Sequence, residues 1–210
     1  MRPAIIILVY LLSGPVQSQS VQFSAEMNNA VKFFDQATNS KDYLIALSKL
    51  EAIAKANPTE WLPYYYMSLV KIRMSMLKMG DADQLANQSI NLIEKAKQIQ
   101  VNDEILCAES LAYTAKMTVS PYTRWLRLES KIKNPLSLAK KMNKDNPRIY
   151  ALEASLQYHM PVLLGGGCGK SFSIALVASD KLNAQSKTNT VFYMPHWGVN
   201  IIKDILDNCK

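Results

Sequence analysis

Histidine and cysteine are scarce in this chain of 210 residues, which has two of the first and three of the second. That scarcity argues against metal centres built from several His or Cys ligands and against histidine-based catalysis. Glycine and proline number 7 and 9, so the composition is neither collagen-like nor typical of a disordered chain. Hydrophobic residues make up 49% of the chain, which suits one domain with a sizeable core.

Long apolar runs are also rare, and the clearest lies near the N-terminus, over residues 4–12. It follows a basic residue and precedes small residues at the positions that a signal peptidase recognises, so we expect a signal peptide over residues 1–18, cut near Ser18 or Ser20. The run is shorter than the roughly 20 residues of a membrane-spanning helix. We therefore expect an exported protein, periplasmic or secreted, whose residues 19–210 form a single domain without a membrane span.

Basic residues outnumber acidic ones, 24 to 17, which gives a formal net charge of +7. They are scattered over segments with helical spacing, and the densest group is Lys140, Lys141 and Lys144. Cations of this kind are favoured at the C-terminal end of a helix. The charge therefore predicts no nucleic-acid partner.

Helical spacing of apolar residues runs through almost the whole chain after residue 24. Asn-Pro pairs at 57–58, 134–135 and 146–147, and a Gly-Asp pair at 80–81, fall between these segments and predict helix boundaries. The expected helices are 24–38, 43–56, 60–79, 83–99, 103–117, 135–144, 147–159, 171–183 and 198–209. Two short strand candidates, 162–164 and 191–194, have no evident partner. The prediction is an all-α protein in which short connections make successive helices antiparallel.

Part of this pattern resembles the tetratricopeptide repeat. Ala46, Leu50 and Pro58 match the second helix of such a repeat, where a small residue allows close approach and proline ends the unit. Ala86 and Ile90 repeat the small–large pair without a closing proline. No unit carries the whole repeat signature.

The C-terminal third carries a more particular resemblance. Asn146-Pro147-Arg148, Met160-Pro161, the glycines 165–167 and Pro195-His196-Trp197-Gly198 follow one another in that order. This series is similar to that of secreted bacterial tetratricopeptide-like proteins, mostly without an assigned activity. The resemblance implies antiparallel helical hairpins in an α–α superhelix, a location outside the cytoplasm, and a binding or scaffolding role without catalytic residues. Cys168, directly after the glycines, departs from the pattern.

An aromatic cluster and a glycine-rich segment are the most distinctive local features of the chain. The candidates for a ligand groove are Trp61, Tyr64, Tyr65, Tyr66 and Arg73; packing between helices is the alternative interpretation of the aromatic residues. Gly165, Gly166 and Gly167 are expected to form a turn between helices. Pro195, Trp197 and Gly198 are expected to anchor the final helix.

The segment Gly169-Lys170-Ser171 has the ending of a phosphate-binding loop. Leu164 stands where the first glycine of such a loop belongs, and too few residues follow to build the parallel sheet that carries these loops. We therefore expect an inter-helix turn, with a nucleotide-binding enzyme as the remote alternative.

The His and Cys residues of the C-terminal part, His159, Cys168, His196 and Cys209, match no compact zinc motif. His159 lies on the apolar stripe of its helix and is predicted to be a hydrogen-bonded core residue. We therefore predict neither a metal site nor a cofactor. Cys107 falls in the most apolar helix and is expected to be a buried thiol. Cys168 and Cys209 lie near segment ends and are candidates for a disulfide, which the sequence alone leaves open.

Taken together, these features predict an exported, non-enzymatic helical-repeat protein that binds a protein, a peptide or a small ligand through a groove. A structural subunit of an envelope assembly is the alternative from another class.

Overall fold

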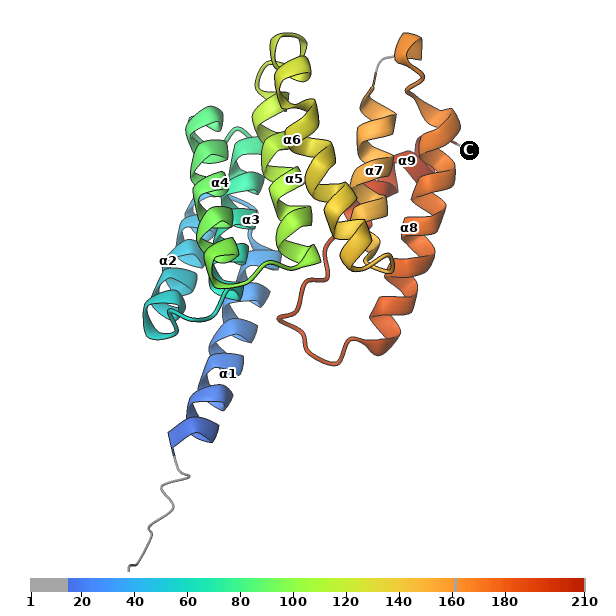
Figure 1. The fold of residues 1–210 in the computed structure, drawn as a ribbon. Helices are drawn as coiled ribbons and strands as arrows, with labels where there is room; N and C mark the ends of the chain where they lie inside the picture. Colours follow the sequence, from blue (N-terminus) through green and yellow to red (C-terminus); the bar gives the residue numbers. More distant parts are fainter. Residues whose placement is uncertain (1–14, 161, 210) are drawn as a thin grey trace, which may run out of the picture.

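The computed structural model describes residues 15–160 and 162–209, which within these limits form nine α-helices, one short 3₁₀ helix and no strand (Figure 1). The elements are α1 (Pro15–Gln36), α2 (Ser40–Ala56), α3 (Leu62–Met76), α4 (Ala82–Ile99), α5 (Asp103–Thr118), α6 (Pro121–Met142), α7 (Pro147–His159), η1 (Val162–Leu164), α8 (Cys168–Thr188) and α9 (Val199–Asn208). The all-α prediction is therefore confirmed. The predicted strand candidates are instead the 3₁₀ helix and part of the connection between α8 and α9.

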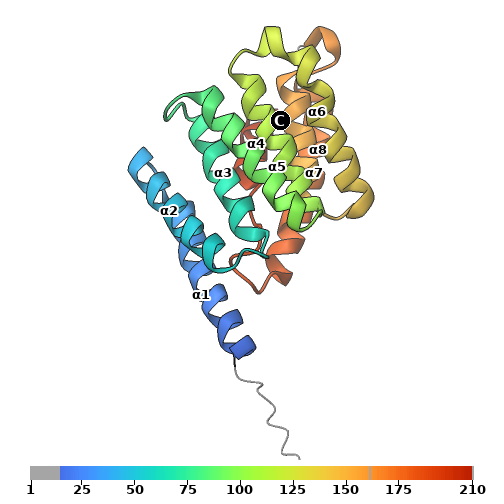
Figure 2. The same cartoon turned by 60° about the vertical axis from the view of Figure 1, so that its left-hand side comes forward.

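Successive helices pair as antiparallel hairpins, and the hairpins stack side by side (Figures 1 and 2). The most extensive pairings join α3 with α4, α5 with α6, and α7 with α8. The first helices of the hairpins, α1, α3, α5 and α7, also contact one another in series, and α9 packs against α7 and α8. The first helices thus form an inner row, while α2, α4, α6 and α8 pair with them on the outside.

Polar side chains fix where several helices begin. Asn39, Asp81, Asn102 and Asn146 precede α2, α4, α5 and α7, and each accepts a hydrogen bond from a backbone N–H of the first turn at 2.9–3.1 Å. Such caps satisfy N–H groups that have no partner within the helix. The breaks predicted at 57–58, 80–81 and 146–147 all fall between helices.

The boundary predicted at Asn134-Pro135 is wrong. Pro135 lies inside α6, and the helix expected over 135–144 is the last part of this longer helix. A proline in a helix removes one backbone hydrogen bond and costs about 3 kcal/mol. Pro135 is buried in the same stripe as Leu128, Ile132 and Ala139, so packing of this face against the rest of the bundle offsets the loss.

The segment 189–198, which joins α8 to α9, lies against the inner row of helices. The Tyr193 ring packs edge-on against Phe23 of α1, and its hydroxyl lies 3.2 Å from Ser24 Oγ. Trp197 Nε1 donates a hydrogen bond to Tyr65 Oη of α3 at 2.6 Å. This crossing segment therefore ties the end of the chain to its first hairpins.

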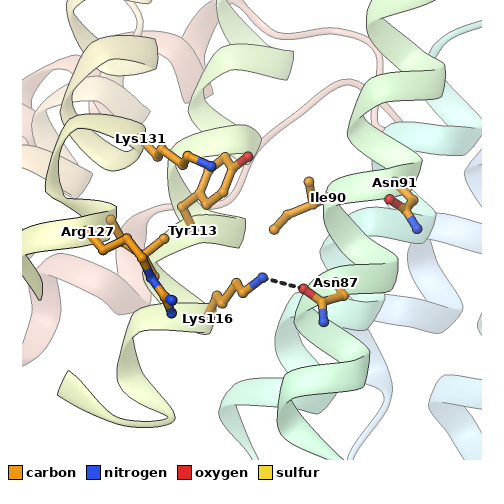
Figure 3. Close-up of a pocket in the computed structure, with 8 residues that line it drawn as sticks. Asn87, Ile90, Asn91, Tyr113, Lys116, Arg127 and Lys131 are labelled. Carbon is orange, nitrogen blue, oxygen red and sulfur yellow. Dashed lines mark hydrogen bonds between the residues drawn. The ribbon is translucent and has the colours of Figure 1, made fainter. Parts of the chain in front are cut away.

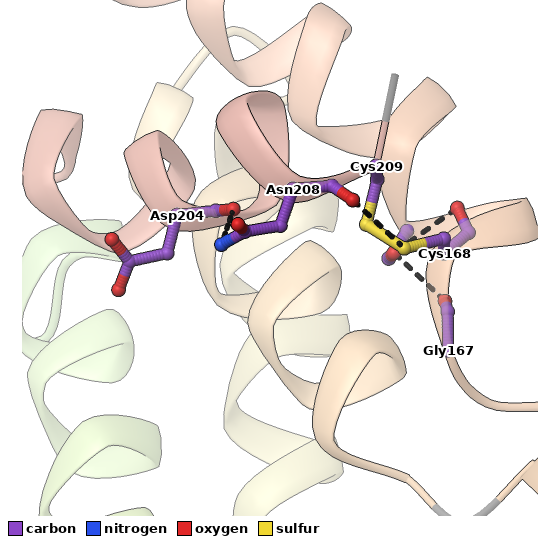
Figure 4. The surroundings of a disulfide bond; sticks show 6 residues. Gly167, Cys168, Asp204, Asn208 and Cys209 are labelled. Carbon is purple, nitrogen blue, oxygen red and sulfur yellow. Dashed lines mark hydrogen bonds between the residues drawn. A yellow bond between two sulfur atoms is a disulfide. The ribbon is translucent and has the colours of Figure 1, made fainter.

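The connection between α7 and α8 contains the predicted glycine turn. Gly165 and Gly167 have φ of +83° and +89°, a region that favours glycine. A Cβ atom on Gly166 would lie 1.8 Å from the carbonyl oxygen of Met160, so a side chain does not fit there. Directly after this turn, Cys168 forms a disulfide with Cys209 at the end of α9, with the two Cα atoms 5.1 Å apart (Figure 4).

The predicted signal peptide falls mostly outside the described residues, since the structure describes nothing before residue 15. Ser18 and Ser20, the expected cleavage positions, lie within α1. Within the described part of the chain, no helix is long and apolar enough to cross a membrane.

Candidate functional site

The aromatic residues predicted to line a groove lie mostly in the core of the first hairpins. Tyr65 and Tyr66 are buried, whereas Trp61 and Tyr64 are half-buried against the same core. The rings of Trp61, Tyr65 and Tyr66 make edge-to-face contacts with centroid distances of 5.5 and 5.3 Å. The buried pair therefore follows the packing alternative rather than an open groove. Arg73 is exposed on α3.

A buried arginine sits at the point where α3, α5, α7 and the crossing segment meet. Arg148 on α7 is 1% exposed, and its Nη2 donates to Glu104 Oε1 of α5 at 2.5 Å. Its Nη1 donates to Gln185 Oε1 at 3.0 Å and to the backbone oxygen of Trp197 at 3.3 Å. Glu104 also accepts hydrogen bonds from Asn146 Nδ2 and Tyr65 Oη. The cluster is a polar centre inside the helical stack.

The charges of this centre are mutually dependent. Burial raises the pKa of Glu104 above its usual value, and the neighbouring Arg148 opposes that rise. Burial disfavours the guanidinium charge, but Glu104 and the other neighbours together outweigh this effect, so the pKa of Arg148 is raised. The buried Tyr65 phenol has a strongly raised pKa, chiefly because of burial, and stays neutral. The centre is enclosed and internally paired, so it orients the crossing segment and offers no open ligand site.

An open cleft of about 460 Å³ lies elsewhere, between the outer helices α4 and α6, with α5 behind them (Figure 3). Polar, basic and apolar side chains line it together: Asn87, Ile90, Asn91, Tyr113, Lys116, Arg127, Leu128 and Lys131.

The side chains of the cleft reach across from one helix to the next. Lys116 Nζ on α5 donates to Asn87 Oδ1 on α4 at 2.6 Å (Figure 3). Lys131 Nζ on α6 lies 5.4 Å from the centroid of the Tyr113 ring on α5, within range of a cation–π contact. Arg127 makes no ion pair with any described residue. The walls are therefore apolar and aromatic in part, with three cations around them.

Acidic side chains are missing from the residues that line the cleft. The nearby Glu94 and Glu109 both form ion pairs with Lys97, at 3.2 and 3.1 Å. Burial, and then these two glutamates, raise the pKa of the Tyr113 phenol, so it stays neutral. The cleft thus presents net positive charge beside an uncharged aromatic ring, which suits a flat apolar ligand that carries carboxylates.

The sequence gives no direct sign of this cleft. Arg127 and Lys131 are spaced i,i+4 on α6, as Asn87 and Asn91 are on α4, so each pair shares one face of its helix. Those spacings are the sequence signal from which each polar helix face could have been predicted. They did not show that the two faces meet over Tyr113, because that follows from how two hairpins stack.

The remaining sequence candidates are placed as follows. Ser171 Oγ donates to the backbone oxygen of Gly167 at 2.8 Å within the first turn of α8, and Lys170 is exposed. A 3₁₀ helix, not a strand, precedes this segment. The prediction for His159 is wrong: it is exposed at the last residue of α7, and Nδ1 bonds to the backbone oxygen of Ser155.

The two cysteines of the zinc candidates, Cys168 and Cys209, are joined in the disulfide and offer no thiolate ligands. Cys107 is free and buried in α5, as expected. Trp197 bonds to Tyr65, and Gly198, with φ of +127°, directly precedes α9.

No model of a known protein family matches the chain, and no curated protein matches it in sequence. Among solved structures, the chain is similar to the HusA haemophore from Porphyromonas gingivalis. The TM-score is 0.79 at 27% sequence identity, and the match covers 90% of this chain and 92% of the haemophore. The chain therefore shares its all-helical fold with this haemophore. The finer assignment to tetratricopeptide-like proteins stays a prediction.

Proposed function

We propose that this protein is an exported, non-enzymatic haem-binding protein of the haemophore type, and that the cleft between α4 and α6 holds the haem. The observation that carries the proposal is the likeness to the HusA haemophore over nearly the whole length of both chains. The predicted signal peptide, which lies mostly outside the described residues, agrees with a protein that meets its ligand outside the cytoplasm.

The chemistry of the cleft supports the proposal. Haem is a flat aromatic molecule with two carboxylates on one edge. Tyr113 and Ile90 offer aromatic and apolar contact for its faces, and Arg127 and Lys131 lie on the α6 side, where they would pair with the carboxylates. Among the three ligand types expected from the sequence, this arrangement favours a small ligand over a protein or peptide.

The first experiment is a titration of the purified protein with haemin, followed by the change in Soret absorbance. We expect a saturable change at micromolar protein. Arg127→Gln combined with Lys131→Gln should weaken binding about tenfold, because two carboxylate partners are lost. Lys187→Gln, at the exposed end of α8, is the matched control and should bind as the wild type does.

Haemin dimethyl ester makes the test specific for the carboxylates. The ester should bind the wild-type protein about tenfold more weakly than haemin, and it should bind the double variant with no further loss. If the Soret absorbance does not change on titration with haemin, the proposed function is overturned. If the double variant binds haemin with wild-type affinity, the protein binds haem, but outside this cleft.

A further inference from the structure

One end of the helical stack carries large apolar side chains that residues 15–160 and 162–209 leave uncovered. Tyr122 and Leu126, in the first turns of α6, and Leu163 of η1 are each 90% or more exposed, and Val162 is 77% exposed. We call these four residues the apical patch. Figures 1 and 2 both show the start of α6 and the 3₁₀ helix η1 at the same end of the molecule.

The two parts of the apical patch are held by a common core. Trp125, which lies between Tyr122 and Leu126 in sequence, is half-buried in a cluster with Leu128, Ile132 and Leu156 of α7. Helix α7 leads directly to η1. The inward face of α6 therefore packs while its outward face, with Tyr122 and Leu126, projects. Single exposed apolar residues are ordinary, but four strongly exposed ones at one end indicate an interaction surface.

Basic residues outnumber acidic ones next to the apical patch. Residues 119–133 and 159–172 carry five Lys or Arg residues and one Glu. Arg124 is neutralised by Asp83 at 2.6 Å, and Lys133 by Glu129 at 2.5 Å. Within the described part of the chain, Arg127, Lys131 and Lys170 form no ion pair; Arg127 and Lys131 line the cleft, so Lys170 is the cation that the patch has to itself.

We infer that the apical patch docks this protein on an anionic lipid surface, with the four apolar side chains entering the interface and Lys170 facing the headgroups. Aromatic and apolar side chains beside an unpaired cation are a combination that such surfaces bind. The apolar residues project from two separate elements and do not line a groove. A flat lipid surface can meet both projections together, whereas a peptide needs a groove. The inference goes beyond haem binding and does not depend on it.

Flotation with vesicles tests this inference. The full mature chain is mixed with vesicles of phosphatidylcholine alone or with about 30% phosphatidylglycerol, a fraction chosen to give a clear negative surface. We expect flotation with the anionic vesicles only, weakened by salt because exposed charges are screened.

Variants separate the apolar from the electrostatic contribution. Leu126→Glu combined with Leu163→Glu should abolish flotation, and Lys170→Gln should weaken it about fivefold, the effect of one cation near an anionic membrane. Leu44→Glu is the control, because Leu44 is an exposed leucine of α2 outside the patch, and this variant should float as the wild type does. Circular dichroism and thermal unfolding verify that each variant is folded.

Three results would overturn the inference. They are no flotation of the wild type with anionic vesicles, equal flotation with neutral vesicles, and flotation of the folded Leu126→Glu/Leu163→Glu variant. If the wild type does not float with anionic vesicles but binds a purified protein through the patch, the patch is assigned to a protein partner.

Discussion

Replacement of Glu104 by glutamine should destabilise the protein strongly, although it exchanges one atom and nearly preserves shape. Arg148 is buried and is held by Glu104, Gln185 and the backbone of Trp197. The variant leaves the guanidinium in the core without a counter-charge. A guanidinium cannot escape this cost by losing its proton, because it stays charged at any accessible pH.

The magnitude follows from the burial of the pair. Removal of one partner of a buried ion pair costs about 3–5 kcal/mol. The glutamine oxygen still accepts a hydrogen bond and the Glu104 side chain is 14% exposed, so the lower end, about 3 kcal/mol, applies. For a chain of this size that corresponds to a fall in Tm of about 6–12 °C.

The reverse variant, Arg148→Met, should cost less. The carboxyl left behind can bind a proton, and burial already raises its pKa. When the pKa of a carboxyl is higher in the folded protein than in the unfolded chain, the folded protein binds more protons. The Arg148→Met protein should therefore gain stability as the pH falls toward the pKa of Glu104 in the unfolded chain. Urea unfolding of both single variants and of the double variant forms a complete cycle, and the double variant should lose less than the sum of the singles.

Glu129→Gln provides the control, because the Glu129–Lys133 pair lies on the surface of α6. Its loss should change stability by no more than about 0.5 kcal/mol. A Glu104→Gln protein within about 1 kcal/mol of the wild type would refute the assignment of Arg148 as a charged core residue.

Three further predictions concern the crossing segment and the cysteines. His196 Nε2 lies 2.9 Å from Asp35 Oδ2, and this bond raises the pKa of His196 above 6.5. The pairing of protonated His196 with Asp35 stabilises the fold fully below pH 6.5, and this stabilisation is lost as the pH rises through the pKa of His196 in the folded protein. The Tm difference between wild type and His196→Gln should therefore shrink from pH 5.5 to pH 9. A Tm difference that stays constant over this range would contradict the prediction. Cys168→Ser/Cys209→Ser, which opens a link between positions 41 residues apart, should lower the unfolding free energy by about 2–5 kcal/mol, and unchanged urea unfolding would exclude a stabilising role. The buried Cys107, whose pKa burial raises well above 9.0, should react with a thiol reagent only after denaturant is added; rapid labelling of the folded protein would contradict its burial.

Much of the fold was predictable because the signals are local. The stripe of Ile149, Leu152 and Leu156 and the cap at Asn146 act within a few residues, and α7 has the bounds predicted for it. Pro135 shows where local rules fail. The cost of a proline is local, but the packing that offsets it comes from residues that α6 meets only in the folded protein.

The candidate site shows the same division more sharply. Sequence alone determined the helical class, most helix boundaries, the glycine turn and the burial of Cys107, since each depends on the spacing of neighbouring residues. Only the tertiary structure decided that Tyr65 is buried and bonded to Trp197, because this bond joins it to a segment more than a hundred residues away in the chain. The stacking of α4, α5 and α6 likewise decided which cations surround Tyr113, because helical spacing fixes the face of each residue but not which faces meet.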